Sequence, residues 1–266
     1  TYSKAGNLML VDADDNWCGM LSGGCLEGDI AERARKVIAD NAAEIVTYDL
    51  AADDEIFGLG VGCDGTLHVV IQPLTRETNY EPLSGLIDAL QATGFGRLQL
   101  SHGDETIETG QIAAPPRVLL LGAGQDADPL VRFGVALGWE VAISDHRPAA
   151  VERIQASGAA TVQCRPAADL PDGFDLERFD AAVVMSHNLT ADRAYLDALA
   201  SSSIAFIGLL GPPHRKNRLL GELGSKADLL RDRLHGPVGK AIGGRGAAAI
   251  ALEIAAELQS RFNPAA

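Results

Sequence analysis

The segment that most constrains the fold of this chain is an apolar run, RVLLL, which leads directly into the turn Gly122-Ala123-Gly124-Gln125-Asp126-Ala127. The turn matches the pattern G-x-G-x-x-A, and the residues after it have helical spacing. The first glycine of such a turn allows a tight bend, and the second lets a phosphate approach the backbone. We therefore expect Gly122 and Gly124 to bind a phosphate at the helix N-terminus. A tight turn that only connects strand and helix is the alternative.

Beyond this turn, short apolar runs alternate with segments that have the apolar spacing of helices. Runs nearly free of polar residues are typical of parallel strands buried on both faces. The alternation predicts a Rossmann-like, doubly wound α/β domain with a parallel sheet. Its expected strands cover residues 117–122, 139–145, 160–164, 181–186 and 205–211, and its expected helices cover 126–137, 149–157, 191–200, 215–223 and 247–261.

The first part of the chain has a different pattern, in which turn residues separate short strand-like runs. This pattern predicts an α+β domain with hairpins over residues 1–114, followed by the Rossmann-like domain over 115–266, because Ala113-Ala114-Pro115-Pro116 reads as a linker. The chain begins at Thr1 and enters a strand pattern at once, so we expect the first domain to be truncated at its start. Its expected hairpins cover residues 7–21 and 96–109, its helices 26–41 and 82–93, and its further strands 45–50 and 66–72.

Composition excludes several classes of function. The chain has 22 Lys and Arg against 36 Asp and Glu, a formal net charge of −14, which opposes binding to nucleic acid or to an anionic membrane. No apolar run approaches the length of a membrane span. The four cysteines show no C-x-x-C spacing, so they predict neither a zinc site nor a disulfide scaffold, and a reducing cytoplasm is the expected location.

The stretch SGGC, Ser22 to Cys25, raises a separate question about chemistry. Two glycines deliver Cys25 to the start of an expected helix, where the helix dipole stabilises a thiolate. Such a thiolate could ligate a metal or carry sulfur. A small cysteine packed in the core is the alternative, and the residues alone favour it slightly. Cys63, in the glycine-rich loop GVGCDG, is a second candidate with the same alternative.

In the second domain, polar residues follow the expected strands at the edge where ligands of such sheets bind. Asp145 stands 23 positions after Gly122, where an acidic residue hydrogen-bonds a ribose 2′-hydroxyl, while Arg147 beside it suits a phosphate instead. His146 and His187 follow strands at the same edge. His235, in the turn HGPVG, is expected to close over the same site. Each histidine could instead form hydrogen bonds with backbone groups of its own loop.

Eight segments, spread in order over most of the chain, are familiar together: TYSKAG, MLSGGCLEGDIAERA, GLGVGCDGTLHVVIQPL, VLLLGAGQDADPL, GWEVAISDHRP, VVMSHN, FIGLLGPPHRKNRL and LHGPVG. They resemble the XdhC/CoxI family of accessory proteins for molybdenum hydroxylases such as xanthine dehydrogenase. The resemblance implies that the chain binds the molybdenum cofactor, as molybdopterin or a dinucleotide form. It also implies support for cofactor sulfuration and for insertion into an apo molybdenum hydroxylase.

The resemblance also implies roles for residues and partners. Cys25 is then the thiol that ligates the metal or carries sulfur, and it acts with Cys63 and His187. A cysteine desulfurase and a second copy of the chain, in a homodimer, are the further candidate partners. The cofactor-binding residues are then Ser22, Gly23, Gly24, Gly122, Gly124, Asp145, His146, Arg147 and His235.

The family pattern is not matched everywhere. Pro212-Pro213 and the segment 240–247 depart from it. A maturation or chaperone protein is expected rather than a free-standing catalyst. The alternative is an NAD(P)-dependent oxidoreductase that uses the same glycine turn, although no Y-x-x-x-K relay accompanies it. No G-x-S-x-G or H-E-x-x-H motif indicates a hydrolase.

Overall fold

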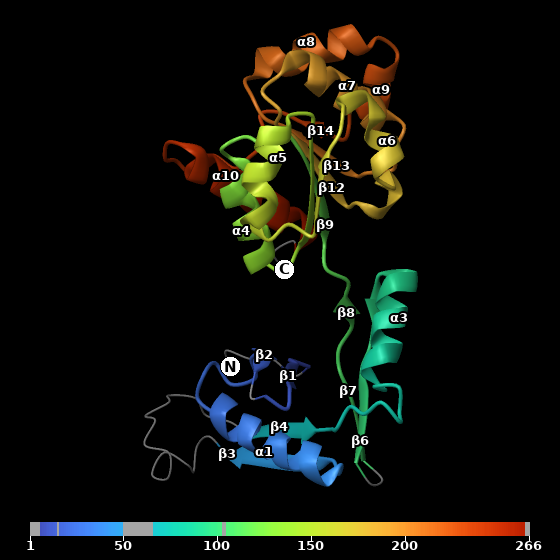
Figure 1. Ribbon diagram of the computed structural model, residues 1–266, viewed down its shortest axis with the longest axis vertical. Helices are drawn as coiled ribbons and strands as arrows, with labels where there is room; N and C mark the ends of the chain where they lie inside the picture. Colours follow the sequence, from blue (N-terminus) through green and yellow to red (C-terminus); the bar gives the residue numbers. More distant parts are fainter. Residues whose placement is uncertain (1–5, 15, 50–65, 103–104, 264–266) are drawn as a thin grey trace. The chain divides into compact units, whose positions relative to one another are not determined.

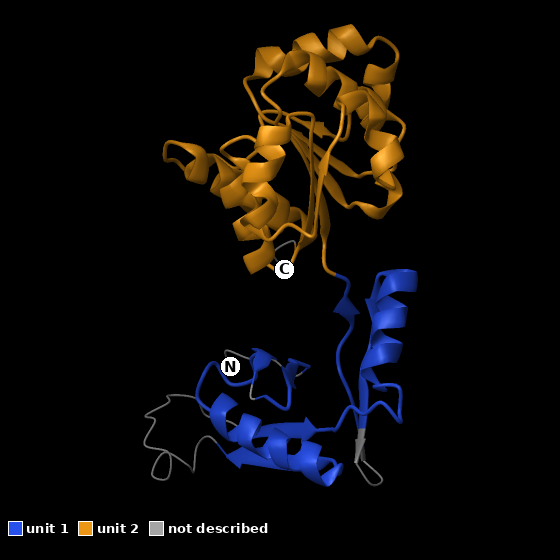
Figure 2. Cartoon of the chain, in the orientation of Figure 1, with its two compact units in different colours: residues 1–114 blue, residues 115–266 orange. Residues whose placement is uncertain are grey.

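A computed structural model describes residues 6–14, 16–49, 66–102 and 105–263. The chain divides into two compact units, residues 1–114 and residues 115–266 (Figure 2). Each unit has its own core, and each is described by itself. Cys63 lies outside the described residues. Among the described residues, none of the helices has the length and apolar character needed to span a bilayer.

The first unit begins with an antiparallel hairpin. Its strands are β1 (Met9–Val11) and β2 (Trp17–Gly19), with Leu10 opposite Cys18. The helix α1 (Glu27–Asp40) follows and packs on a second antiparallel pair, β3 (Glu44–Asp49) and β4 (Thr66–Ile71). Apolar residues recur at helical spacing along α1, and the core therefore forms between this helix and alternate residues of the strand pair.

The rest of the first unit joins a helix to two short strand pairs. The helix α3 (Leu83–Thr93) ends at Gly94, whose φ of +79° suits glycine. The hairpin of β6 (Gln99–His102) and β7 (Glu105–Glu108) was expected from the turn residues between them. The pair β5 (Phe95–Gly96) and β8 (Ile112–Ala113) was not expected, because two-residue strands carry no periodic signal.

The second unit contains a six-stranded parallel sheet with the order β11-β10-β9-β12-β13-β14. This is the Rossmann order, in which the chain leaves the first strand toward one face and the fourth toward the other. The sheet confirms the Rossmann-like doubly wound fold. The strands are β9 (Arg117–Leu121), β10 (Glu140–Asp145), β11 (Thr161–Cys164), β12 (Ala181–Val184), β13 (Phe206–Leu209) and β14 (Leu234–His235).

Helices cover both faces of this sheet (Figure 1). One face is covered by α4 (Ala127–Ala136), α5 (Pro148–Ile154) and α10 (Ala247–Phe262). The other is covered by α6 (Leu170–Gly173), α7 (Leu189–Ala200), α8 (Pro213–Leu223) and α9 (Lys226–Leu230). The central strands β9 and β12 are almost wholly buried between these layers, which explains their nearly unbroken apolar sequence.

Three differences from the expected elements have physical reasons. The strand β14 and the helices α6 and α9 are too short to show a hydrophobic period. The helix expected from residue 215 begins at Pro213, because proline is tolerated in a first helical turn. The helix expected over 149–157 is α5 followed by a 3₁₀ turn, Gln155–Ser157, that ends at Gly158.

Candidate functional site

The glycine turn lies at the carboxyl ends of the neighbouring strands β9 and β12, from which the chain continues toward opposite faces of the sheet. Gly122 has a φ of +127°, and a Cβ there would come within 2.6 Å of the carbonyl carbon and oxygen of Met185. Only glycine fits this conformation and this contact. The Gly122 N–H donates to the Ser144 carbonyl at 2.8 Å, so the turn is also tied to β10. The turn therefore needs its first glycine for its backbone and its packing.

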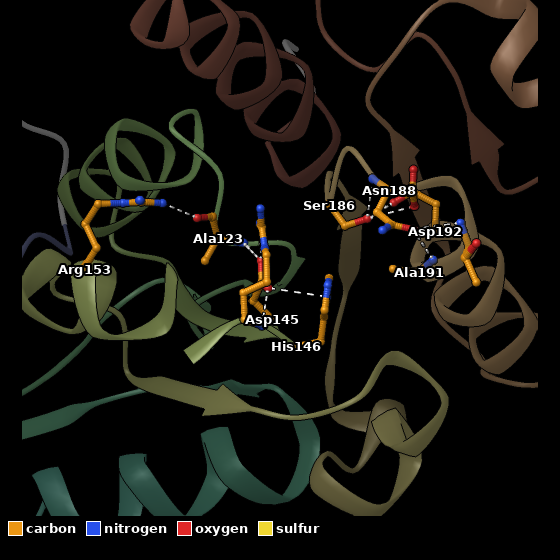
Figure 3. Close-up of polar contacts among 10 residues, drawn as sticks. Ala123, Asp145, His146, Arg153, Ser186, Asn188, Ala191 and Asp192 are labelled. Atoms are coloured by element: carbon orange, nitrogen blue, oxygen red, sulfur yellow. Dashed lines mark hydrogen bonds and ion pairs between the residues drawn. The ribbon is translucent and has the colours of Figure 1, made fainter. Parts of the chain in front are cut away.

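Asp145 and Arg153 hold the turn through hydrogen bonds with the backbone N–H and the carbonyl of the same residue, Ala123 (Figure 3). The Ala123 N–H donates to Asp145 Oδ2 at 2.6 Å, and Arg153 Nη2 donates to the Ala123 carbonyl at 2.8 Å. Asp145 comes from the end of β10 and Arg153 from α5. The conformation of the turn is thus fixed by the protein itself, which preorganises its backbone for a ligand.

The carboxylate of Asp145 has no lone pair left for a ribose hydroxyl. Its Oδ1 accepts hydrogen bonds from the Arg147 backbone N–H at 2.8 Å and from Arg147 Nε at 2.9 Å. Its Oδ2 accepts one from Arg147 Nη2 at 2.7 Å in addition to the Ala123 N–H. The side chain is 0% exposed, whereas that of Arg147 is 44% exposed. A ligand at this edge would therefore meet Arg147 first, contrary to the ribose contact expected of Asp145.

Burial alone would raise the pKa of Asp145. The hydrogen bonds from Arg147 and from the Ala123 N–H outweigh that effect and hold the pKa of this carboxyl below its usual range. The carboxylate thus stays charged and keeps both the turn and Arg147 in place.

His187 lies directly over the second glycine of the turn. A Cβ at Gly124 would be 3.3 Å from Cδ2 and Nε2 of the His187 ring. His187 has a φ of +58°, and its Nε2 is 3.2 Å from Asp126 Oδ2. The structure therefore brings His187 to the turn as expected, but it pairs the ring with an acidic residue at the start of α4. The His187 side chain is 57% exposed.

A group of buried polar atoms lies beside the end of β10. The hydroxyls of Ser144 and Tyr195 and the Nδ1 atom of His146 are buried and make no hydrogen bond with the described residues. His146 Nδ1 is 3.5 Å from Asp145 Oδ1, so His146 lies where the sequence placed it. Burial and the nearby charge of Asp145 raise the pKa of Tyr195 to about 12, so its hydroxyl remains protonated.

A second polar network joins the end of β12 to two helices, and sequence reasoning missed it. The Ser186 hydroxyl donates to Asp192 Oδ1, and Arg215 Nη2 donates to Asp192 Oδ2 at 2.6 Å. Asn188 caps α7 by accepting from the backbone N–H groups of Thr190 and Ala191 at 3.0 and 3.1 Å (Figure 3). Asn188 before a helical run was a readable cap signal, whereas the pairing of Asp192 with Arg215 depends on the packing of α7 against α8.

His235 does not join the glycine turn. It lies in β14, the edge strand, with two strands, β13 and β12, between it and β9. Its ring stacks on Phe206 with centroids 4.5 Å apart, and the Arg261 guanidinium covers the same phenyl ring. Burial, and then the charge of Arg261, lower the pKa of His235. The expectation that it closes over the site with His146 and His187 is therefore corrected to a packing role.

In the first unit, Glu27 organises the SGGC loop. Its carboxylate accepts hydrogen bonds from the backbone N–H groups of Leu21, Ser22 and Gly24 at 2.7 to 2.9 Å, and from the Ser22 hydroxyl at 2.6 Å. Burial opposes the charge, but these hydrogen bonds outweigh it and lower the pKa of Glu27 to about 2. The donors of Ser22 and Gly24 that were expected to bind a cofactor are therefore already engaged.

The two glycines of the loop serve its backbone. Gly23 and Gly24 have φ values of +85° and +110°, and a Cβ at Gly24 would meet nothing within 4 Å. Cys25 is a free, half-buried cysteine that packs against the core of its unit, two residues before α1. Within the described part of the chain, no group of three His, Cys, Asp or Glu side chains is arranged to hold a metal. The structure thus supports the packing role of Cys25 and leaves part of its thiol accessible.

Comparison with known proteins gives consistent matches over both units. A family described as the XdhC Rossmann domain matches residues 118–258, and one described as the XdhC and CoxI family matches residues 1–49. A relative from Bacillus subtilis (strain 168), named as a probable subunit of xanthine dehydrogenase, is 28% identical over 97% of this chain and 88% of its own length. Escherichia coli (strain K12) YqeB is 22% identical over 94% of this chain but only 39% of that protein.

One solved structure covers nearly the whole chain. It is described as a xanthine dehydrogenase from Bacillus halodurans, and it is 27% identical to this chain with a TM-score of 0.76. The match covers 98% of this chain and 88% of that one. Both units and their order are therefore shared with a known protein.

Proposed function

Because the chain belongs to the XdhC and CoxI family, we propose that it is an accessory protein of a molybdenum hydroxylase of the xanthine dehydrogenase type. Its cargo is the molybdenum cofactor, as molybdopterin or a dinucleotide form, and it supports sulfuration of the cofactor and insertion into the apo-enzyme. The name of the Bacillus subtilis relative, which refers to xanthine dehydrogenase, supports this partner. A cysteine desulfurase is the proposed sulfur source, in a reducing cytoplasm.

The main support for the proposal is the fixed glycine turn at the carboxyl ends of β9 and β12. A phosphate group of the cargo fits this turn for two reasons. Gly124 carries no side chain of its own, although the His187 ring lies over it. Arg147 and Arg153, which donate to Asp145 and to the Ala123 carbonyl, bring positive charge beside the turn. Asp126 opposes a phosphate, and its Oδ2 lies 3.2 Å from His187 Nε2.

We assign the sulfur chemistry to Cys25. Glu27 fixes the loop before α1, so the thiol has a defined position, and the residue is only half-buried. When bound, the cofactor supplies a metal and dithiolene sulfurs beside which such a thiol can act as a ligand or a sulfur carrier. His187 then holds the cargo over the glycine turn rather than taking part in a reaction of its own.

The NAD-dependent form of the oxidoreductase alternative is less well supported, whereas the exposed Arg147 suits the 2′-phosphate of NADP. A dinucleotide bound in the usual way needs a free acidic residue at the end of the second strand for its ribose. Here Arg147 and Ala123 occupy every acceptor site of that residue, Asp145. An NAD-type ligand would have to displace Arg147 from Asp145, which would make its binding free energy less favourable. The phosphate of the cofactor would not need to break these hydrogen bonds.

An anaerobic titration of the full chain tests the proposal. The purified protein is titrated by calorimetry with molybdenum cofactor and, separately, with NAD and NADP. We expect the cofactor to bind, and we expect Gly124→Asp to weaken binding at least tenfold, because it places a carboxylate at the phosphate position. Gly221→Asp is the matched control, since a Cβ at Gly221 in the same unit meets open space. Binding of NAD in preference to the cofactor would reject the proposal.

A further inference from the structure

The first hairpin of the chain presents apolar side chains to solvent. Met9 and Val11 of β1 pack against the core of the first unit, so the alternate residues Leu8 and Leu10 point to the other side. Leu8 is 38% exposed, Leu10 48% and Met20, after β2, 47%. Together these three residues form what we call the hairpin patch. The exposed Cys18, opposite Leu10, adds to the same surface.

A patch of this kind is unusual for a chain with no partner. β1 and β2 form a sheet of only two short strands, which is marginally stable unless one of its faces is covered. On one side Met9 and Val11 pack in part on the core, although Trp17, opposite Val11, is 51% exposed. The other side exposes Leu8 and Leu10, and large apolar residues of this kind are common in protein interfaces. Exposed leucine and methionine side chains at neighbouring positions therefore indicate a docking surface.

Charge identifies the kind of partner. Residues 1–114 contain 19 Asp and Glu against 6 Lys and Arg, whereas residues 115–266 contain 17 against 16. Between Lys4 and Arg33 the sequence holds six acidic residues and no Lys or Arg. Two of them, Asp12 and Asp14, form the turn of the hairpin itself. The patch is thus apolar, and the turn at one end of the hairpin adds the acidic residues Asp12 and Asp14.

This distribution argues against two other occupants. A second copy of the chain would bring the same acidic residues against its own, and like charges across an interface suppress association. An anionic membrane is repelled for the same reason. A protein surface with an apolar patch bordered by lysine and arginine is attracted by both features of the hairpin.

The position of the hairpin directly before the SGGC loop indicates a function for the hairpin patch. β2 runs directly into the SGGC loop, so Cys25 comes only five positions after Met20 along the chain. We propose that the hairpin patch is the docking surface for the molybdenum hydroxylase, which meets it with a basic-bordered apolar patch. This inference rests on the proposed function. Docking there brings the receiving enzyme close to the Cys25 thiol.

Surface plasmon resonance with immobilised molybdenum-free xanthine dehydrogenase tests the inference on the full chain. Leu10→Ser/Met20→Ser removes apolar area without changing charge. The matched control, Ile38→Ser/Ile87→Ser, alters two residues of the same unit that are 41% and 45% exposed. We expect the patch variant to bind at least tenfold more weakly than the wild type, the control to bind within about twofold, and wild-type affinity to fall as salt is raised.

Several outcomes would overturn the inference. Equal affinity of the patch variant and the wild type would reject the patch while leaving the accessory role intact. Affinity that does not depend on salt would reject a basic partner surface. A homodimer seen by light scattering and dissolved by the patch variant would assign the surface to a second copy. Absence of wild-type binding would reject the inference and the proposed partner together. Circular dichroism and thermal melting establish that each variant is folded.

Discussion

At the scale of single residues, two acidic side chains position the two candidate loops. Glu27 gathers the donors of the SGGC loop, and Asp145 holds the glycine turn together with Arg147. In both cases the carboxylate is buried and charged because several donors converge on it. These acids therefore act by positioning backbone rather than by contact with a ligand.

Replacing Glu27 tests its role in the first loop. The pKa of Glu27 is lowered from 4.5 to about 2, so the charged form stabilises the fold above about pH 4.5, and this contribution disappears as the pH falls toward 2. We expect Glu27→Gln to reduce the free energy of unfolding by roughly 2 to 3 kcal/mol at pH 7. Urea denaturation followed by circular dichroism measures this loss in unfolding free energy.

The pH dependence supplies the check on this result. The difference between the wild type and Glu27→Gln should shrink as the pH is lowered from 5 toward 2. Glu32→Gln, on the exposed side of the same helix, is the control and should change little at any pH. A difference that stays constant down to pH 2 would mean that the charge of Glu27 is not what stabilises the loop.

The two glycines of the turn should respond differently to alanine. Gly122→Ala forces a φ of +127° on alanine and brings its Cβ within 2.6 Å of Met185 backbone, so we expect a loss of at least about 3 kcal/mol. Gly124→Ala contacts only the exposed His187 ring, at 3.3 Å, and should cost less than about 1 kcal/mol. Denaturation followed by the fluorescence of the buried Trp139, in a Trp17→Phe background, reports the second unit alone. Equal losses would contradict the assigned geometry.

At the scale of secondary structure, the network of Asp192 joins β12, α7 and α8. Asp192 is 0% exposed, and the Arg215 side chain that it neutralises is 20% exposed. The network fixes how the two helices begin at the carboxyl edge of the sheet. The network also reaches the glycine turn, because a Cβ at Gly122 would come within 2.6 Å of the Cα of Ser186, which donates to Asp192.

Breaking this pair should be costly. Asp192→Asn leaves Arg215 charged without a carboxylate, and we expect a loss of roughly 3 to 5 kcal/mol in unfolding free energy. Asp192→Asn/Arg215→Met should recover part of it, since no uncompensated charge remains. Asp197→Asn is the control on the same helix, because its pair with Lys226 is exposed and should contribute less than about 1 kcal/mol. If Asp192→Asn lowered the free energy of unfolding no more than the control, the pair of Asp192 and Arg215 would not stabilise the fold.

The elements that sequence predicted well are those in which one physical signal dominates. β9 and β12 are buried on both faces, and α1 buries one stripe, so their hydrophobic patterns indicate strand and helix directly. β14 could not be predicted, because two residues without a pattern become a strand only when β13 is beside them.

The same limit applies to the candidate site. The glycine turn and His187 come together as their positions after β9 and β12 indicated. The hydrogen bonds of Asp145 and Asp192 could not be read from the sequence. Those of Asp145 depend on how Arg147 folds back and on where the Ala123 backbone N–H lies. That of Asp192 depends on Arg215, which comes from another helix. His235 was misplaced because its motif gave no sign that Phe206 would cover its ring.

At the scale of the whole molecule, the two units differ in charge. The first unit carries the excess of acidic residues, which suits docking to a basic protein surface and opposes an anionic ligand. The second unit is nearly neutral and has Arg147 and Arg153 beside its glycine turn, which suits a phosphate. In the proposed function, the phosphate of the cargo is thus bound by the second unit, and the docking surface for the receiving enzyme lies on the first.

If the units fold separately, residues 115–266 should be stable on their own. This segment contains a six-stranded sheet covered on both faces, and the residues of its two core clusters, among those that the structure describes, all lie between Val118 and Phe262. We expect the isolated segment to show the same Trp139 unfolding midpoint as the full chain carrying Trp17→Phe. A midpoint lowered by more than about 1 M urea, the equivalent of a 1 to 3 kcal/mol interaction, would show that the first unit stabilises the second.

Reconstitution shows whether this chain delivers the molybdenum cofactor to a hydroxylase, as we propose. Molybdenum-free xanthine dehydrogenase is incubated anaerobically with sulfurated cofactor bound to this chain, and xanthine oxidation is then measured. We predict that activity returns with the wild-type chain and falls at least tenfold with Cys25→Ala, which keeps the fold because a half-buried side chain is only shortened. Activation by free cofactor alone, to the same extent and at the same rate as with the wild-type chain, would contradict the account.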